Sequence, residues 1–215
     1  EQVEAGDIAD LVARWTGIPV QRLLAGERRK LLDLDSHLAD RVRKHIGSEM
    51  DVELIIEPEP LGTGGALRFA RQKLCSDPVL VMNGDTWLAA DLCGFVERHR
   101  QSCASISMLC VPVLDSARFD VVEIDTDGVL TFPSREQGRD DIGPNLISAG
   151  NYLLSRSALD ALDANAGESL EHDLLRRGVL GPILGFVPKD TSFIDIGTPD
   201  SLRDAGRLIG ARDLI

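Results

Sequence analysis

Residues 78–86 decide the fold, and they read Pro-Val-Leu-Val-Met-Asn-Gly-Asp-Thr. The apolar run from Val79 to Met82 is short and is followed by the turn residues Asn83 and Gly84, which is typical of a buried strand that ends in a loop. Asp85 then lies just past the carboxyl end of a central strand, where open α/β sheets bind their ligands. A carboxylate at this edge can bind Mg2+, because the rest of the metal's shell can come from water and phosphate oxygens. The alternative is an aspartate that only caps a helix or closes a turn.

Helix and strand patterns alternate on both sides of this run. A helix is expected from Gly65 to Cys75, another from Asp91 to about Arg100, and an apolar run extends from Ala104 to Val111. This alternation predicts an α/β fold with a Rossmann-like, mainly parallel sheet and helices on both faces. The other expected elements are a strand at 52–56, an antiparallel hairpin at 119–132, a loop at 135–144, strands at 146–154 and 183–187, two short helices between these strands, and a last helix opened by Thr198 and Pro199.

The first 46 residues differ from the rest because they show helix patterns and no strand pattern. Between Glu27 and Ile46 the apolar residues recur every three or four positions, which indicates a long amphipathic helix. We therefore expect a helical N-terminal segment at residues 1–46 and an α/β domain at residues 47–215.

The charge of the chain excludes several classes of partner. Its 215 residues include 35 acidic and 23 basic side chains, which gives a formal net charge of -12. Such a chain does not attract nucleic acid or anionic lipid over a broad surface, so no nucleic-acid or membrane partner is expected. There is no apolar stretch of about 18 residues, and the first thirty residues lack the pattern of a signal peptide, which predicts a cytoplasmic location.

A second aspartate repeats the context of Asp85. Asp195 follows the apolar residues Phe193 and Ile194 and precedes a helix, so it also lies at the end of a short strand. Two carboxylates at strand ends can converge on one metal ion, and we therefore predict Asp85 and Asp195 as ligands of Mg2+.

The segment from Glu59 to Leu67 joins a strand to a helix and contains three glycines, at 62, 64 and 65. Glycines let a backbone approach a ligand closely, and amides at the start of a helix can face a phosphate or a base. The spelling matches neither a P-loop nor the usual dinucleotide motif. A glycine turn with a purely structural role is the alternative.

Five motifs together resemble the sugar-1-phosphate nucleotidyltransferases, and their order and spacing are most similar to the branch that makes GDP-heptose or GDP-mannose. The resemblance covers about residues 38–208, and its motifs are Glu59 to Leu67, Asn83 to Thr86, Ala149 to Leu154, Ser169 to Asp173 and Phe193 to Pro199.

The resemblance implies a reaction and a role for each matching residue. A sugar 1-phosphate of the heptose or mannose type would attack the α-phosphorus of a nucleoside triphosphate, with GTP favoured, and pyrophosphate would leave in an Mg2+-dependent step. Catalysis and metal binding would fall to Asp85 and Asp195. Gly62, Thr63, Gly84 and Asp85 would bind the nucleotide, and Gly150, Glu171 and Glu136 would lie near the sugar.

One element of the family pattern does not occur in the sequence. The family's G-T-R-L loop and its lysine-bearing stretch hold the triphosphate, and neither is present upstream of Glu59. This predicts reduced activity and leaves open a second hypothesis, a non-catalytic nucleotide-sugar-binding or interaction protein that keeps the fold. A third hypothesis is a metal-dependent glycosyltransferase with the acidic motif Asp125-Thr126-Asp127, which falls in the expected hairpin turn. A sheet without its first strands also predicts a homo-oligomer that covers the edge.

Residues 5–40 resemble a different family. The segment from Trp15 to Val20, followed by the helix pattern from Glu27, is similar to the stretch that precedes the second ATPase module of Clp-type AAA+ disaggregases. No Walker-type loop follows it, so ATPase activity is not implied. The chain therefore resembles a junction of two unrelated pieces.

Overall fold

The computed structural model describes Lys44, residues 52–133 and residues 144–210. By its internal contacts the chain divides into two compact units, Glu1–Pro58 and Glu59–Ile215. Except for Lys44, which is helical, the predicted helical segment at 1–46 lies outside the described residues, as does nearly all of the predicted loop at 135–144. The predicted boundary at residues 46 and 47 stays a prediction.

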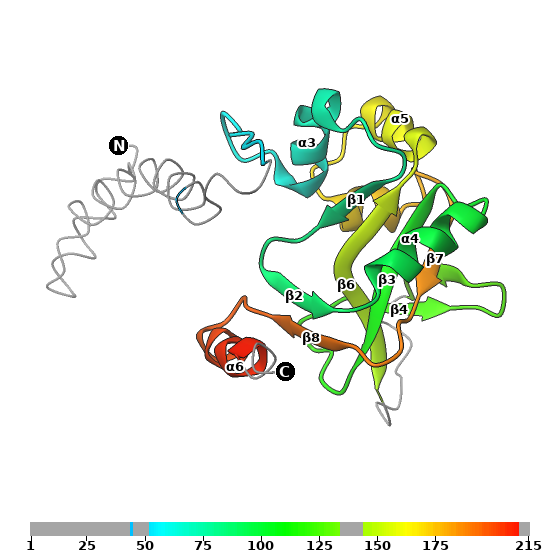
Figure 1. Cartoon of the computed structure of the whole chain (residues 1–215). Helices are drawn as coiled ribbons and strands as arrows, with labels where there is room; N and C mark the ends of the chain where they lie inside the picture. The colour runs from blue at the N-terminus through cyan, green and yellow to red at the C-terminus, as the bar shows by residue number, and fades with distance from the viewer. Residues whose placement is uncertain (1–43, 45–51, 134–143, 211–215) are drawn as a thin grey trace, which may run out of the picture. The chain divides into compact units, whose positions relative to one another are not determined.

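The second unit is built on a six-stranded sheet in the order β1-β6-β3-β7-β5-β4, with a further pairing between β6 and β4 (Figure 1). Two more strands form a separate antiparallel ribbon, β2-β8. The strands are β1 (Val79–Met82), β2 (Thr86–Ala89), β3 (Ile106–Val113), β4 (Val121–Ile124), β5 (Val129–Thr131), β6 (Asn145–Leu154), β7 (Ile183–Phe186) and β8 (Ser192–Asp195). The helices are α3 (Gly62–Phe69), η1 (Arg71–Lys73), α4 (Leu92–Gln101), α5 (Arg156–Ala164), η2 (Leu170–Leu175) and α6 (Pro199–Gly210).

The α/β class is confirmed, but the prediction of a mainly parallel sheet is wrong for the bonded pairs. Among the described strands only β3 and β7 pair in parallel. The reason is the position of β6, which runs antiparallel to both β1 and β3 and lies between them. Strands β1, β3 and β7 consequently run in the same direction, as the prediction of a parallel sheet requires. Because β6 lies between β1 and β3, however, these two strands are not hydrogen-bonded to each other.

Helices cover both faces of the sheet, as predicted. On one face α5 and η2 pack on Ile106, Met108 and Tyr152, and on the other face Phe95 of α4 packs on Leu109 and Leu153. Neighbouring residues of β3 and of β6 therefore serve opposite faces, because successive side chains of a strand alternate. None of the helices in the described residues is long and apolar enough to cross a membrane.

Several expected elements are confirmed with shifted ends, and some expectations are wrong. The predicted strand at 52–56 has no strand conformation, and Val52, Ile55 and Ile56 are exposed, so the alternating pattern lacks a face to cover. The short strand β2 was not expected, because its sequence Thr-Trp-Leu-Ala does not alternate. Strand β1 lies at the edge of the described sheet and not at its centre. The last helix begins as predicted, with the Thr198 hydroxyl accepting a hydrogen bond from the Ser201 amide at 3.1 Å.

Strand β6 contains an irregularity that shapes the rest of the unit. Its register against β3 shifts because Leu109 faces Asn151 while Cys110 faces Ser148, which leaves Ala149 and Gly150 as extra residues. Gly150 has a φ of 68°, a left-handed conformation that glycine adopts without strain. The irregularity is fastened to the end of β1, where the Asn83 amide donates to the Gly150 carbonyl oxygen at 2.8 Å.

We expect Gly150→Ala to lower the free energy of unfolding by about 1–3 kcal/mol, because a Cβ there adds left-handed strain and would lie 2.5 Å from Nδ2 of Asn83. Urea unfolding followed by circular dichroism measures the change. Gly206→Ala in α6 is the matched control, because a Cβ there meets nothing within 4 Å. An unchanged stability of the Gly150 variant would contradict the structure at this point.

His99 of α4 is a buried histidine, 5% exposed, and its Nδ1 lies 2.7 Å from the Ser107 hydroxyl. Burial lowers its pKa below the usual 6.5, Asp77 opposes this, and Arg100 adds to it. The unfolded chain therefore takes up the proton at a higher pH than the folded chain does.

We expect the free energy of unfolding to fall as the pH drops below about 6.5 and to keep falling through the lowered pKa of His99. Urea unfolding between pH 7.5 and 5 tests this. In His99→Gln the part of the slope due to this residue should disappear, and an identical slope in both proteins would show that His99 does not carry it.

Candidate active site

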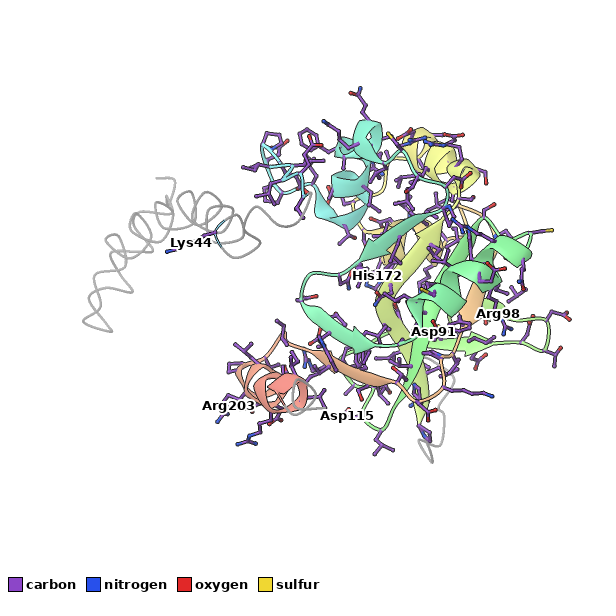
Figure 2. The ribbon with its side chains drawn as sticks, in the orientation of Figure 1. Lys44, Asp91, Arg98, Asp115, His172 and Arg203 are labelled. Atoms are coloured by element: carbon purple, nitrogen blue, oxygen red, sulfur yellow. The ribbon has the colours of Figure 1, made fainter. Side chains whose placement is uncertain are left out.

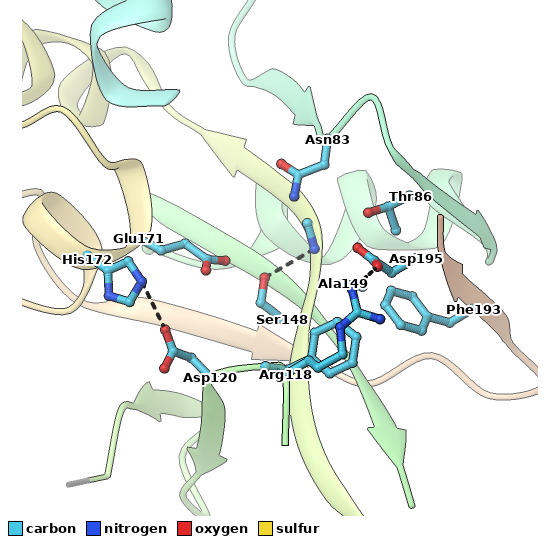
Figure 3. Close-up of a pocket in the computed structure, with 12 residues that line it drawn as sticks. Asn83, Thr86, Arg118, Asp120, Ser148, Ala149, Glu171, His172, Phe193 and Asp195 are labelled. Carbon is cyan, nitrogen blue, oxygen red and sulfur yellow. Dashed lines mark hydrogen bonds and ion pairs between the residues drawn. The ribbon is translucent and has the colours of Figure 1, made fainter. Parts of the chain in front are cut away.

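A polar pocket of about 200 Å³ lies beside the irregular part of β6. Residues from five places in the chain reach it: the end of β1, the ribbon of β2 and β8, the loop after β3, β6 and η2 (Figure 3). Its lining consists of Asn83, Thr86, Arg118, Phe119, Asp120, Ser148, Ala149, Gly150, Glu171, His172, Phe193 and Asp195.

The ribbon of β2 and β8 brings the two predicted metal ligands onto neighbouring backbone segments. Thr86 and Asp195 are directly opposite each other, and the Ile196 amide donates to the carbonyl oxygen of Asp85 at 2.9 Å. Thr86 and Asp195 share one face of the ribbon and line the pocket. Asp85 is not among the lining residues, and its carboxylate lies 3.5 Å from the Thr86 hydroxyl. Convergence of both carboxylates on one metal ion stays a prediction.

Asp195 is held by two donors on the same oxygen. Its Oδ1 accepts a hydrogen bond from Nη2 of Arg118 at 3.0 Å and another from the Gly197 amide at 3.0 Å. The Arg118 guanidinium also lies over the Phe119 ring, 5.7 Å from its centroid, and that ring packs edge-on against Phe193 at 6.1 Å. The loop after β3 is thereby joined to β8 by an ion pair and an aromatic contact.

On the other side of the pocket, Glu171 is positioned by Tyr152. The Tyr152 hydroxyl donates to Oε1 of Glu171 and lies 3.0 Å from the Ser148 hydroxyl, which in turn accepts from the Gly150 amide at 3.1 Å. Burial raises the pKa of Tyr152 far above its usual value, and the Glu171 carboxylate raises it further, so the hydroxyl keeps its proton. Glu171 therefore faces the pocket as a fixed acceptor, and Gly150, the other predicted sugar-side residue that the structure describes, lines the same pocket.

A second ion-pair group borders the same side. Asp120 lies 3.4 Å from Nε2 of His172 and 3.8 Å from Arg176, so one carboxylate links the loop before β4 to η2. The Ser169 hydroxyl accepts from the His172 amide and caps η2, while Arg176 lies over the Phe132 ring.

The predicted nucleotide-binding turn packs against the loop that precedes η2. The Gly64 amide donates to the Glu168 carbonyl at 2.7 Å, and the Leu170 amide donates to the Thr63 hydroxyl at 2.9 Å. Gly62 has a φ of 71°, and a Cβ there would lie 2.6 Å from the Glu168 oxygen. Packing thus explains the glycine at 62 without a ligand, and neither Gly62 nor Thr63 lines the pocket.

The loop that receives this turn is itself fixed. Asp173 accepts hydrogen bonds from the Ser169 amide at 2.9 Å and the Glu168 amide at 3.0 Å. The Ser169 bond is the main reason that the pKa of Asp173 is lowered, with the Glu168 bond, Arg177 and His172 adding to it and burial opposing it.

The remaining predicted residues fall in different places. Gly84 lies in the turn after β1, where a Cβ would meet nothing within 4 Å. Glu136 lies outside the described residues. Asp125 closes the hairpin between β4 and β5 by accepting from the amides of Asp127 and Val129, so the acidic motif there has a structural role and lies outside the pocket lining.

Sequence reasoning missed most of the lining. Arg118 belongs to no predicted element, and Phe119 and Asp120 fall at the start of the predicted hairpin at 119–132, whereas the structure places all three in the loop between β3 and β4. His172 belongs to one of the five motifs but has no predicted role, and it lines the pocket with Nε2 at 3.4 Å from Asp120. The missed lining residues are Asn83, Thr86, Arg118, Phe119, Asp120, Ser148, Ala149, His172 and Phe193.

The donors present fit a hard divalent cation only in part. Within the described residues no group of three or more His, Cys, Asp or Glu side chains could hold a metal by itself. Magnesium needs only one or two carboxylates when phosphate oxygens and water supply the rest, so the predicted pair of Asp195 and Asp85 would be a sufficient protein contribution.

Comparison with known proteins agrees with this fold and identifies the family. The family model of the nucleotidyl transferases matches residues 13–211, so the chain belongs to the nucleotidyl transferase family. D-glycero-alpha-D-manno-heptose 1-phosphate guanylyltransferase of Aneurinibacillus thermoaerophilus is 32% identical over 157 residues, which are 73% of this chain and 66% of that protein. HddC from Yersinia pseudotuberculosis complexed with GMP-PN superposes with a TM-score of 0.67 at 31% identity, over 81% of this chain and 74% of HddC.

The N-terminal part has a different relative, as its sequence predicts. Chaperone protein ClpB 2 of Parasynechococcus marenigrum is 90% identical over 42 residues, which are 20% of this chain and 5% of ClpB. The chain thus spans about two thirds of its guanylyltransferase relative and a small fraction of the chaperone.

We expect Thr63→Val to lower the free energy of unfolding by about 1–2 kcal/mol, because the Leu170 amide loses its acceptor. Thr63→Ser keeps the oxygen and should retain most of the stability. Urea unfolding of both variants measures the difference. A loss in the serine variant with none in the valine variant would mean that the methyl group, and not the hydrogen bond, matters at this position.

Proposed function

We propose that the protein is a sugar-1-phosphate nucleotidyltransferase that uses Mg2+, a nucleoside triphosphate, with GTP favoured, and a sugar 1-phosphate of the heptose or mannose type. The observation that carries the proposal is the pocket in which Asp195, Gly150 and Glu171 come together beside the backbone of Asp85. The names of the relatives support the chemistry, since one is a heptose 1-phosphate guanylyltransferase and the HddC structure contains GMP-PN.

The size of the pocket supports separate binding places for the two substrates. About 200 Å³ is less than the roughly 300–1,000 Å³ of sites that enclose a drug-sized ligand. We infer that the pocket receives the sugar phosphate, whose predicted contacts Gly150 and Glu171 line it. The nucleotide would lie outside, toward Gly84 and the turn of Gly62 and Thr63.

In this proposal the protein aligns two anions and offsets their charge. The phosphate oxygen of the sugar 1-phosphate forms a bond to the α-phosphorus of the triphosphate, and the bond to pyrophosphate breaks. A divalent cation held by Asp195 and Asp85 would neutralise charge on both substrates. Glu171, held by Tyr152, would accept a hydrogen bond from a sugar hydroxyl and so set the orientation of the sugar ring.

A second candidate is a binding protein without catalysis. It is favoured by the charge of the pocket, where Asp120, Glu171 and Asp195 stand against the single permanent cation of the lining, Arg118. It is also favoured by the absence of a G-T-R-L sequence in the 215 residues.

Pyrophosphate release in the presence of Mg2+ separates the two candidates. The purified chain is incubated with GTP and either mannose 1-phosphate or D-glycero-alpha-D-manno-heptose 1-phosphate, and dTTP, UTP and CTP replace GTP in parallel. We expect release with GTP that falls about 100-fold or more in Asp195→Asn and in Asp85→Asn, since charge stabilisation in such transfers has this magnitude.

The matched control is Asp127→Asn, which removes one carboxylate from the exposed hairpin turn outside the pocket lining and should leave release unchanged. Heat stabilisation by GDP-mannose without any pyrophosphate release would support the binding protein instead. Release that persists undiminished in both aspartate variants would remove the basis for a metal site at these residues.

A further inference from the structure

The pocket has few cations for a site that is to receive phosphate. Three carboxylates line it, and of these Asp120 is already bridged to His172 and Arg176. Among the lining residues Arg118 is the one side chain with a permanent positive charge, and it is occupied by Asp195. A phosphate would therefore need Arg118, and a divalent cation would need Asp195, although these two residues are paired with each other.

The geometry of this ion pair makes exchange inexpensive. Nη2 of Arg118 and Oδ1 of Asp195 are 3.0 Å apart, and the Arg118 side chain is 50% exposed, so the pair contributes little to stability. The Gly197 amide donates to the same Oδ1 and would keep Asp195 oriented if Arg118 left. A Cβ at 197 would lie 3.0 Å from Oδ1 of Asp195 and 3.1 Å from Nη2 of Arg118, so the glycine backbone lies close to the ion pair.

The aromatic contact keeps the guanidinium in the pocket. Arg118 lies over the face of Phe119, which packs on Phe193, two residues before Asp195 in β8. Stacking of this kind orients the planar guanidinium without using its N–H donors. Figure 3 shows the Arg118 guanidinium beside Asp195. A turn of its N–H groups from Asp195 to a ligand would leave its contact with the Phe119 ring in place.

We propose that Arg118 is an exchangeable counterion: it pairs with Asp195 while no cation is bound, and it binds a substrate's phosphate monoester when Asp195 binds a divalent cation. This inference rests on the proposed function and adds to it a phosphate ligand supplied by the loop after β3. The phosphate belongs either to the sugar 1-phosphate or to the nucleotide, and the chemistry of recognition, a guanidinium fork on a phosphate, is the same for both.

Binding measurements with Arg118→Gln test the exchange without relying on turnover. Electron paramagnetic resonance of free Mn2+ gives the metal affinity, and calorimetry with mannose 1-phosphate and, separately, GMP gives the phosphate affinity in the presence of Mn2+. We expect the substitution to tighten Mn2+ binding about fivefold, because Asp195 loses its competitor. We expect it to weaken the binding of one phosphate ligand about tenfold or more, and the ligand affected identifies the phosphate that Arg118 receives.

The opposite signs of the two effects exclude a merely structural role, which would weaken both. Arg118→Lys, which keeps the charge, should restore much of the phosphate affinity. Arg203→Gln is the matched control, because it removes the same charge from an exposed ion pair with Asp200 on α6, outside the pocket lining, and should leave Mn2+ binding nearly unchanged (Figure 2). An equal rise of Mn2+ affinity in both variants would show a general electrostatic effect and overturn the exchange.

Two further outcomes separate this inference from the proposed function. Mn2+ binding that is normal in the unmodified protein and unaffected by Arg118→Gln, or unchanged affinity for both phosphates, overturns the exchange and leaves the nucleotidyltransferase proposal standing. An absence of Mn2+ binding in the unmodified protein and in the variant overturns both.

Discussion

The rest of the structure depends on the two extra residues in β6. Ala149 and Gly150 interrupt the pairing with β3. The backbone of β6 therefore turns toward the end of β1, where the Gly150 carbonyl oxygen accepts a hydrogen bond from the Asn83 amide. The same interruption places the Ser148 hydroxyl between the Gly150 amide and Tyr152, which holds Glu171. A regular strand would present only alternating side chains here, whereas the bulge gives the pocket a wall of backbone and hydroxyl groups.

The distribution of charge indicates how an acidic chain would bind the two phosphorylated substrates of the proposed reaction. Its carboxylates do not surround the pocket as free anions, because Asp120 is bridged to η2, Asp195 is paired with Arg118, and Glu171 accepts a hydrogen bond from the Tyr152 hydroxyl. Local pairing therefore matters more than the net charge of -12. A metal ion at Asp195 and a released guanidinium would together add positive charge at the one point where phosphate arrives.

The sequence predicts local features of this fold well and non-local ones poorly. Apolar runs and caps locate β1, β3, β6 and α4 to within a few residues, since these depend on neighbouring positions in the chain. The place of β6 between β1 and β3 depends on pairing between distant segments, which leaves no local pattern. The same limit applies to the site: strand ends point to Asp85 and Asp195, but Arg118 reaches Asp195 across 77 positions from an irregular loop. At Gly62 the sequence could not distinguish packing on Glu168 from the approach of a ligand.

The described pocket is built from residues of one of the two units of the chain. Every lining residue lies between Asn83 and Asp195, within the unit Glu59–Ile215, and the contacts that hold the pocket together join residues of that unit. All the described residues that we propose for the sugar phosphate therefore belong to this unit. Stabilising the departing pyrophosphate is a different task, which needs positive charge or backbone amides at the far end of the triphosphate. Affinity and rate should accordingly respond to different parts of the protein, with the β6 bulge and Arg118 governing the first.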